Sequence, residues 1–244
     1  MRREVRERIP IAYVPIPGRS NPVAIVSTYN SLIIDVSLGE HSVVGGSISE
    51  AVANMVGAFL RRLERVVGEI PPLEISVFAS GSIIDSFTYA AVTNAVLEFL
   101  GGKLDSDMIR AAQEIDKFLG CDHSILALRE FPLRGSLYIW RDGEGGVDSE
   151  APVVVDVNED EVVEMVYNPP PYLDMITHLA GVATIDSFKL LSEGKVPNTL
   201  KVLNALWHAL YGIPLRSWKV MPYAAIKDVD GARFLEIKEV GFLR

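Results

Sequence analysis

The chain has 244 residues, of which 49% are hydrophobic and 23% are charged, a globular composition long enough for one large domain or two small ones. Its net charge of −9 disfavours general binding to nucleic acids and to anionic membranes, so we expect neither partner. The longest apolar segment, residues 87–100, includes Asn94 and Glu98 and is too short and polar to span a bilayer. Cys121 is the only cysteine, which excludes an intramolecular disulfide and favours a reducing cytoplasm.

The N-terminal part of the chain predicts strands. Three short runs rich in apolar and β-branched residues have strand character: residues 11–14, 23–27 and 31–36. Tyr29 and Asn30 form the expected turn between the last two runs, because asparagine favours turns. Residues 73–78 form a later apolar run of the same kind.

Three segments carry apolar side chains at helical spacing and predict helices: residues 47–67, 86–100 and 106–119. Ser47 or Ser49 can cap the first helix, and Gly68 can end it. The second helix follows the strand at residues 73–78 after only a short turn, so the composition of that turn matters.

The turn reads Ala79-Ser80-Gly81-Ser82-Ile83-Ile84-Asp85-Ser86. Small residues at a helix start leave backbone N–H groups free, and the positive end of the helix dipole favours a phosphate there. The same residues also fit a purely structural turn, in which Ser82 or Asp85 is the helix N-cap. Asp85 distinguishes the two interpretations. Its carboxylate either repels a phosphate or binds a magnesium ion that bridges it to one.

The second half of the chain predicts two pairs of strands separated by two helices. The strands are expected at residues 136–141, 152–157, 221–227 and 233–238, and the helices at residues 172–191 and 198–210. An acidic stretch at residues 158–161 and the proline-rich residues 168–171 interrupt this order. The chain therefore predicts an α+β fold of two lobes, residues 1–157 and residues 158–244.

Four short segments follow one another along residues 1–150: Pro17-Gly18-Arg19-Ser20-Asn21, the turn with its helix start at residues 79–91, residues 111–120, and Gly120-Cys121-Asp122-His123-Ser124. In this order they resemble motifs of the GHMP superfamily of small-molecule kinases, which includes galacto-, homoserine and mevalonate kinases. The first is similar to the PGRxN element, the second to the phosphate loop, the third to the helix after that loop, and the fourth to the SGxDxxxS element.

The resemblance implies a ribosomal S5 domain 2-like N-terminal lobe with a smaller α+β C-terminal lobe, and an ATP- and Mg²⁺-dependent kinase of a small hydroxylated metabolite. The implied roles are Ser80, Gly81, Ser82, Asp85 and Ser86 for the nucleotide, Glu114 and Ser82 for the metal, Asp122 as the catalytic base, and Arg19 for the substrate. Asp122 also fits a helix cap, and Arg19 also fits a turn arginine.

The phosphate loop departs from the family pattern, because Ile83-Ile84-Asp85 replaces its small residues. A turn and strand at residues 230–234 also stand where a third, glycine-rich motif is expected. A second hypothesis is therefore a GHMP-fold homologue that has lost nucleotide binding and binds a small ligand or a protein partner. A third is another enzyme on the same scaffold. Pairing through the C-terminal helices to form a homodimer is a further expectation.

Overall fold

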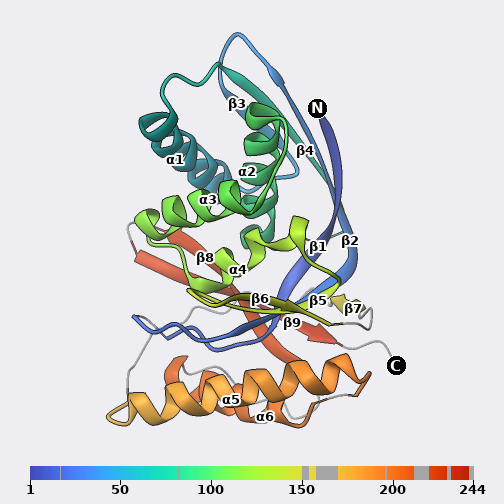
Figure 1. Ribbon diagram of the computed structural model, residues 1–244, viewed down its shortest axis with the longest axis vertical. Coiled ribbons are helices and arrows are strands. Elements are labelled where there is room, and N and C mark those ends of the chain that lie inside the picture. Colours follow the sequence, from blue (N-terminus) through green and yellow to red (C-terminus); the bar gives the residue numbers. More distant parts are fainter. Residues whose placement is uncertain are drawn as a thin grey trace. The chain divides into compact units, whose positions relative to one another are not determined.

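The computed structural model (Figure 1) describes residues 1–16, 18–81, 83–149, 154–157, 170–195, 197–211, 220–229 and 232–241. Its contacts divide the chain into two compact units. Unit 1 comprises Met1–Glu7 and Asn30–Cys121, and unit 2 comprises Arg8–Tyr29 and Asp122–Arg244. Two strands, β1 (Arg2–Ala12) and β2 (Val23–Leu38), each contribute residues to both units.

Unit 1 is built around a β-α-β crossover. β3 (Val43–Gly46) pairs in parallel with β4 (Leu73–Ser80), and α1 (Glu50–Val67) connects them. On its other side β4 pairs antiparallel with residues 31–38 of β2. The unit is completed by α2 (Asp85–Gly101) and α3 (Ser106–Leu119), and Figure 1 shows the three helices gathered beside β3 and β4.

The helices of unit 1 differ in how much they bury. Ser49 caps α1, as predicted, and its Oγ accepts the N–H of Val52 at 3.2 Å. One face of α1 is buried, with Val52, Val56, Phe59 and Leu63. α2 is buried on every side from Ser86 to Leu97, as expected for a helix that is apolar all round. α2 is therefore the central helix of the unit.

Unit 2 contains the first part of β2. Residues 23–26 of β2 pair antiparallel with β5 (Leu137–Arg141), which forms a hairpin with β6 (Gly145–Asp148). Residues 27–28 pair in parallel with β7 (Val154–Val157), and β9 (Ala232–Gly241) lies between β7 and β8 (Val220–Val229). α4 (His123–Arg129) and a short 3-10 helix, η1 (Phe131–Leu133), precede β5.

Two helices near the C-terminus lie side by side in unit 2 (Figure 1): α5 (Leu173–Ser192) and α6 (Thr199–Tyr211). Trp207 of α6 is fully buried and donates its indole N–H to the carbonyl of Tyr13 at 2.7 Å. The two rings meet edge to face, with 5.5 Å between their centroids. These contacts hold α6 against the segment that follows β1.

The predicted α+β fold is confirmed, and the five predicted helices correspond to α1, α2, α3, α5 and α6. The predicted turn at Tyr29 and Asn30 is wrong, because β2 continues unbroken from Val23 to Leu38. β2 changes its partners there, from β7 to β4, and the Asn30 side chain donates to Glu7 at 3.1 Å. Tertiary contacts thus override the turn preference of asparagine.

The sequence did not predict β3, α4, β6 or residues 2–10 of β1. These segments are short, or they alternate charged with apolar residues. The predicted lobe boundary at residue 157 lies at the end of β7, and residues 158–169 and 230–231 lie outside the described residues, so the division into lobes stays a prediction. None of the helices in the described part of the chain has both the length and the apolarity of a membrane span.

Candidate functional site

The turn between β4 and α2 approaches β2 closely. Gly81 has a φ of +90°, and a Cβ added there would lie 2.9 Å from Cγ of Asn30, so glycine is required. Ile84 is the N-cap of α2, without a side-chain cap hydrogen bond. The prediction of a Ser82 or Asp85 N-cap is therefore wrong: Asp85 is the first residue inside the helix, and Ser82 lies outside the described residues.

The carboxylate of Glu7, on β1, lies at the start of α2. Its Oε1 accepts the backbone N–H of Ile84 at 2.9 Å, and its Oε2 accepts the side-chain amide of Asn30 at 3.1 Å. Glu7 is fully buried. A buried carboxylate needs such hydrogen bonds, and the positive end of the helix dipole stabilises it further. An acidic side chain thus already lies where the resemblance implies a phosphate.

Asp85 brings a second carboxylate to the same helix end. Its Oδ2 accepts the hydroxyl of Ser49, the α1 cap, at 2.9 Å. Ser86 is only 3% exposed, and its Oγ has no hydrogen-bond partner among the described residues. The start of α2 therefore presents two acidic groups, whereas a phosphate loop presents free N–H and hydroxyl donors.

The acidic residues of α3 point in different directions. Glu114, the predicted metal ligand, is exposed and pairs with Lys117 at 2.8 Å. Asp116 is fully buried and accepts the hydroxyl of Tyr89, on α2, at 2.6 Å. Within the described ranges, no three His, Cys, Asp or Glu side chains are grouped so that they could hold a metal ion. The acid that α3 presents to α2 is therefore Asp116, and the metal role of Glu114 stays a prediction.

Asp122, in unit 2, is the N-cap of α4. Its Oδ1 accepts the N–H of Ser124 at 2.6 Å, so the cap interpretation is confirmed. Burial raises the pKa of the Asp122 carboxyl above its ordinary value, although the hydrogen bonds from Ser124 and the charge of His123 act in the opposite direction. A raised pKa suits a general base, so a cap is compatible with the predicted catalytic role, which stays a prediction.

The segment similar to PGRxN contributes two side chains of different character. Arg19, the predicted substrate residue, forms an exposed ion pair with Asp174 of α5. Asn21 is only 7% exposed, and its Nδ2 has no hydrogen-bond partner among the described residues. A buried donor without a partner costs free energy. A bound water or ligand that accepts its hydrogen bond is one explanation for such a group.

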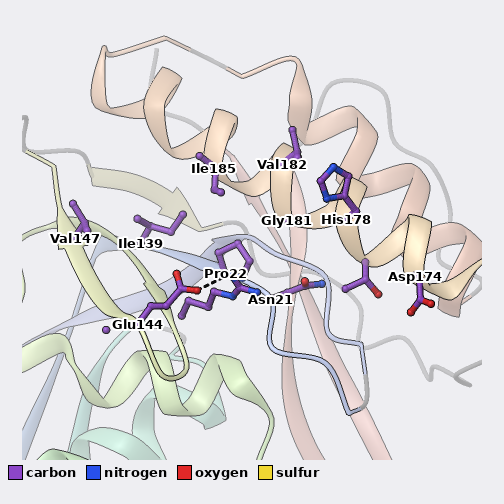
Figure 2. Close-up of a pocket in the computed structure, with 13 residues that line it drawn as sticks. Asn21, Pro22, Ile139, Glu144, Val147, Asp174, His178, Gly181, Val182 and Ile185 are labelled. Carbon is purple, nitrogen blue, oxygen red and sulfur yellow. Dashed lines mark hydrogen bonds and ion pairs between the residues drawn. The ribbon is translucent and has the colours of Figure 1, made fainter.

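A cavity of about 560 Å³ adjoins Asn21 in unit 2. Its walls come from the two residues before β2, the β5–β6 hairpin and α5 (Figure 2). Arg141 and Glu144 on the hairpin form an ion pair at 2.8 Å, and His178 of α5 adds a further polar group. The apolar lining residues are Pro22, Ile139, Val147, Val182 and Ile185. A cavity of this size with a few polar groups on apolar walls suits a small organic ligand.

The predicted site residues divide between the units. Those described in unit 1 are Ser80, Gly81, Asp85, Ser86 and Glu114, and those in unit 2 are Arg19 and Asp122. Sequence reasoning missed Glu7 and counted Asn21 only as part of a motif. The alternation of Val5, Glu7 and Ile9 along β1 would have placed Glu7 on the buried face, had the strand been expected to start at Arg2.

Comparison with solved structures shows the fold. The mevalonate diphosphate decarboxylase from Enterococcus faecalis, in a structure on its mevalonate diphosphate-mediated ATP binding mechanism, matches with a TM-score of 0.58 and 9% identity, over 99% of this chain and 88% of that chain. A structure described as MDDEF in complex with MVAPP, AMPPCP and magnesium has a TM-score of 0.63 at 9% identity, with the same coverage, 99% and 88%.

A D-glycero-D-manno-heptose 1-phosphate kinase from Bacteroides thetaiotaomicron matches with a TM-score of 0.50 and 12% identity, over 97% of this chain and 87% of that chain. No family model and no curated protein matches the sequence. The chain therefore has the GHMP kinase-like fold over its whole length, and at these identities the likeness extends to the fold alone.

Proposed function

We propose that this GHMP-fold protein binds a small hydroxylated or carboxylated metabolite in the cavity beside Asn21. The observation that carries the proposal is a cavity of about 560 Å³ that is lined by Asn21, a residue whose buried Nδ2 has no partner among the described residues. A hydroxyl, carbonyl or carboxylate oxygen of the ligand would accept its hydrogen bond. The carbon skeleton of the ligand would pack against Val182 and Ile185 of α5.

The charges around the cavity favour a ligand with little net charge. Arg141 is paired with Glu144, and Asp174, which lines the cavity, is paired with Arg19. The net charge of the chain is −9, so its overall field opposes a strongly anionic ligand. A neutral or singly charged, partly apolar hydroxy acid satisfies these conditions better than a polyphosphate.

The test is a thermal-shift screen of short-chain hydroxy acids and polyols. Mevalonate diphosphate and heptose 1-phosphate are included because two structural neighbours are named for them. A compound at 100 times its Kd should raise the unfolding free energy by about 2.7 kcal/mol. Calorimetry then compares Asn21→Asp, which keeps the size of the side chain but replaces the amide donor with an acceptor, with the wild type.

Asn21→Asp should weaken ligand binding by about tenfold or more. It removes the hydrogen bond from the Asn21 amide to the ligand and adds repulsion between the new carboxylate and the ligand oxygen. The matched control is Asn198→Asp, at an exposed asparagine outside the cavity, which should leave the affinity unchanged. Equal affinities of the wild type and Asn21→Asp for the hit compound would contradict the proposal.

A second candidate function is ATP- and Mg²⁺-dependent phosphoryl transfer to the same ligand. The observation that favours it is the raised pKa of Asp122, in the segment that resembles SGxDxxxS. Asp122→Asn keeps an N-cap but removes the base, so product formation from Mg·ATP should fall by about 10²–10⁴-fold. This candidate requires the wild type to bind Mg·ATP, so the absence of saturable Mg·ATP binding, or of any product, eliminates it. For either function we expect the protein to be located in a reducing cytoplasm, because Cys121 is its only cysteine.

A further inference from the structure

We propose that Glu7 is a built-in anion that takes the position of a nucleotide phosphate at the start of α2, so that this turn does not bind Mg·ATP. Glu7 belongs to β1, the N-terminal strand labelled in Figure 1, and is far from α2 in sequence. Its fully buried carboxylate accepts the N–H of Ile84, the N-cap residue, at 2.9 Å. The inference does not depend on the cavity beside Asn21, which lies in unit 2.

Asn30 packs against Gly81 of the turn and also donates a hydrogen bond to Glu7. Asn30 donates to the second oxygen of Glu7 at 3.1 Å, and the same side chain lies so close to Gly81 that a Cβ there would meet its Cγ at 2.9 Å. Glu7, Asn30 and the backbone N–H of Ile84 therefore form one hydrogen-bonded group, in which Glu7 and Ile84 are buried. A phosphate could bind Ile84 N–H only by displacing a carboxylate that is already hydrogen-bonded on both oxygens.

The acidic side chains at the start of α2 also disfavour the binding of a phosphate. Asp85 adds a second carboxylate, held by Ser49 at 2.9 Å, so an entering phosphate would meet two negative groups. A magnesium ion bridging acid and phosphate would reverse that repulsion, but the described residues contain no group of three or more metal-ligating side chains. Glu114 is turned toward Lys117 at an exposed site. The residues present do not fit the nucleotide and metal that the family resemblance implies.

The direct test is calorimetric titration with Mg·ATP and with inorganic pyrophosphate. The wild type should show no saturable binding of either probe at millimolar concentration. Glu7→Gln keeps an acceptor for Ile84 N–H but removes the charge, so it should bind pyrophosphate at least about tenfold more tightly than the wild type. Glu4→Gln, at an exposed residue of the same strand, makes the same change in net charge and should leave binding unchanged.

A second measurement uses the wild type alone, in case Glu7→Gln fails to fold. The amide of Ile84 should be protected from hydrogen exchange, and its chemical shift should not move when Mg·ATP is added. Saturable binding of Mg·ATP that moves the Ile84 amide would overturn the proposal, as would equal pyrophosphate affinities of the wild type and a folded Glu7→Gln. Either result leaves the prediction for Asn21 intact, because that prediction is measured with a different ligand and variant.

Discussion

At the scale of single residues, the buried side chains of Glu7 and Asn21 and the half-buried side chain of Asp122 differ in how their polar groups are satisfied. Glu7 receives hydrogen bonds from Ile84 and Asn30. Asp122 receives one from the backbone of α4. The amide nitrogen of Asn21 has no partner in the part of the chain that the structure describes. A bound water or ligand is one explanation for a buried donor that the protein does not satisfy, and Asn21 also lines a cavity, which is why it carries the functional proposal.

Asp122 gives a pH-dependent prediction. Because folding raises the pKa of this carboxyl, the ionised form destabilises the folded state at neutral pH, and this cost is lost as the pH falls to about 4, the ordinary value for aspartate. Asp122→Asn keeps the cap and cannot ionise. Its stability relative to the wild type should therefore increase from pH 4 to pH 7, as measured by urea denaturation at several pH values.

The matched control is Asp105→Asn. Asp105 is also an N-cap, and it accepts the N–H groups of Asp107 and Met108 at 3.1 and 3.0 Å, but it is exposed. Its asparagine variant should not gain stability relative to the wild type over the same pH range. A constant difference between Asp122→Asn and the wild type at every pH would show that the environment of Asp122 does not raise its pKa.

A comparison of alanine variants at Gly81 and Gly102 distinguishes the cost of backbone strain from the cost of close packing. Both have positive φ, +90° and +75°, but only Gly81 has a neighbour, Asn30, within 4 Å of an added Cβ. Gly102→Ala should destabilise the protein by about 1–2 kcal/mol, the cost of the left-handed conformation. Gly81→Ala should cost more, because Asn30 must also move. Equal losses in urea denaturation would mean that the turn tolerates the displacement of Asn30.

At the scale of elements, Ser49 links two helices. Its Oγ accepts the N–H of Val52 in the first turn of α1 and donates to Asp85 at the start of α2, at 3.2 and 2.9 Å. Ser49→Ala removes both bonds and should destabilise the protein by about 1–2 kcal/mol. Ser47→Ala, at the exposed alternative cap position, should change stability by less than about 0.5 kcal/mol. A larger loss of stability for Ser47→Ala than for Ser49→Ala would contradict Ser49 as the N-cap of α1.

The elements that sequence reasoning predicted are those whose local pattern agrees with their environment. α1 and α3 each have an apolar stripe, an N-cap and a glycine stop, so they were found almost to the residue. β1 was largely missed because Arg2, Glu4 and Arg6 alternate with inward-facing residues, and a charge, Glu7, lies on the inward face. The partners Ile84 and Asn30 account for that acidic side chain, and both are distant in sequence.

At the scale of the whole molecule, the net charge of −9 makes a prediction about nucleic acids. Nonspecific binding to DNA needs a cationic surface and has a Kd of about 10⁻⁴–10⁻⁶ M for proteins that possess one. Fluorescence anisotropy with a random duplex at physiological salt should show no saturation with this protein up to about 10⁻⁴ M. Saturable DNA binding at micromolar protein, with an affinity that falls as salt is added, would contradict this prediction. It would show a basic surface patch despite the negative net charge.

The candidate site could be predicted from the sequence only in part, for a physical reason. Motif-like segments located the turn before α2 and the PGRxN-like segment, because such segments are contiguous in sequence. The partners that determine their chemistry come from elsewhere: Glu7 from β1 for the turn, and α5 with the β5–β6 hairpin for the cavity. Long-range pairing of this kind is visible only in the folded chain.

The path of β2 has a consequence for any genetic dissection of the protein. Its residues up to Tyr29 belong to unit 2 and those from Asn30 to unit 1, and β5 and β7 pair only with the earlier part. A gene fragment that stops at Cys121 would encode the whole of unit 1, yet it would remove β5 and β7, so residues 23–28 would lose these partners and form an apolar strand prone to aggregation. Neither unit can therefore be expressed or exchanged as an independent segment of the chain. Deletion variants and chimaeric proteins must keep both halves of β2 together with the strands that pair with each half.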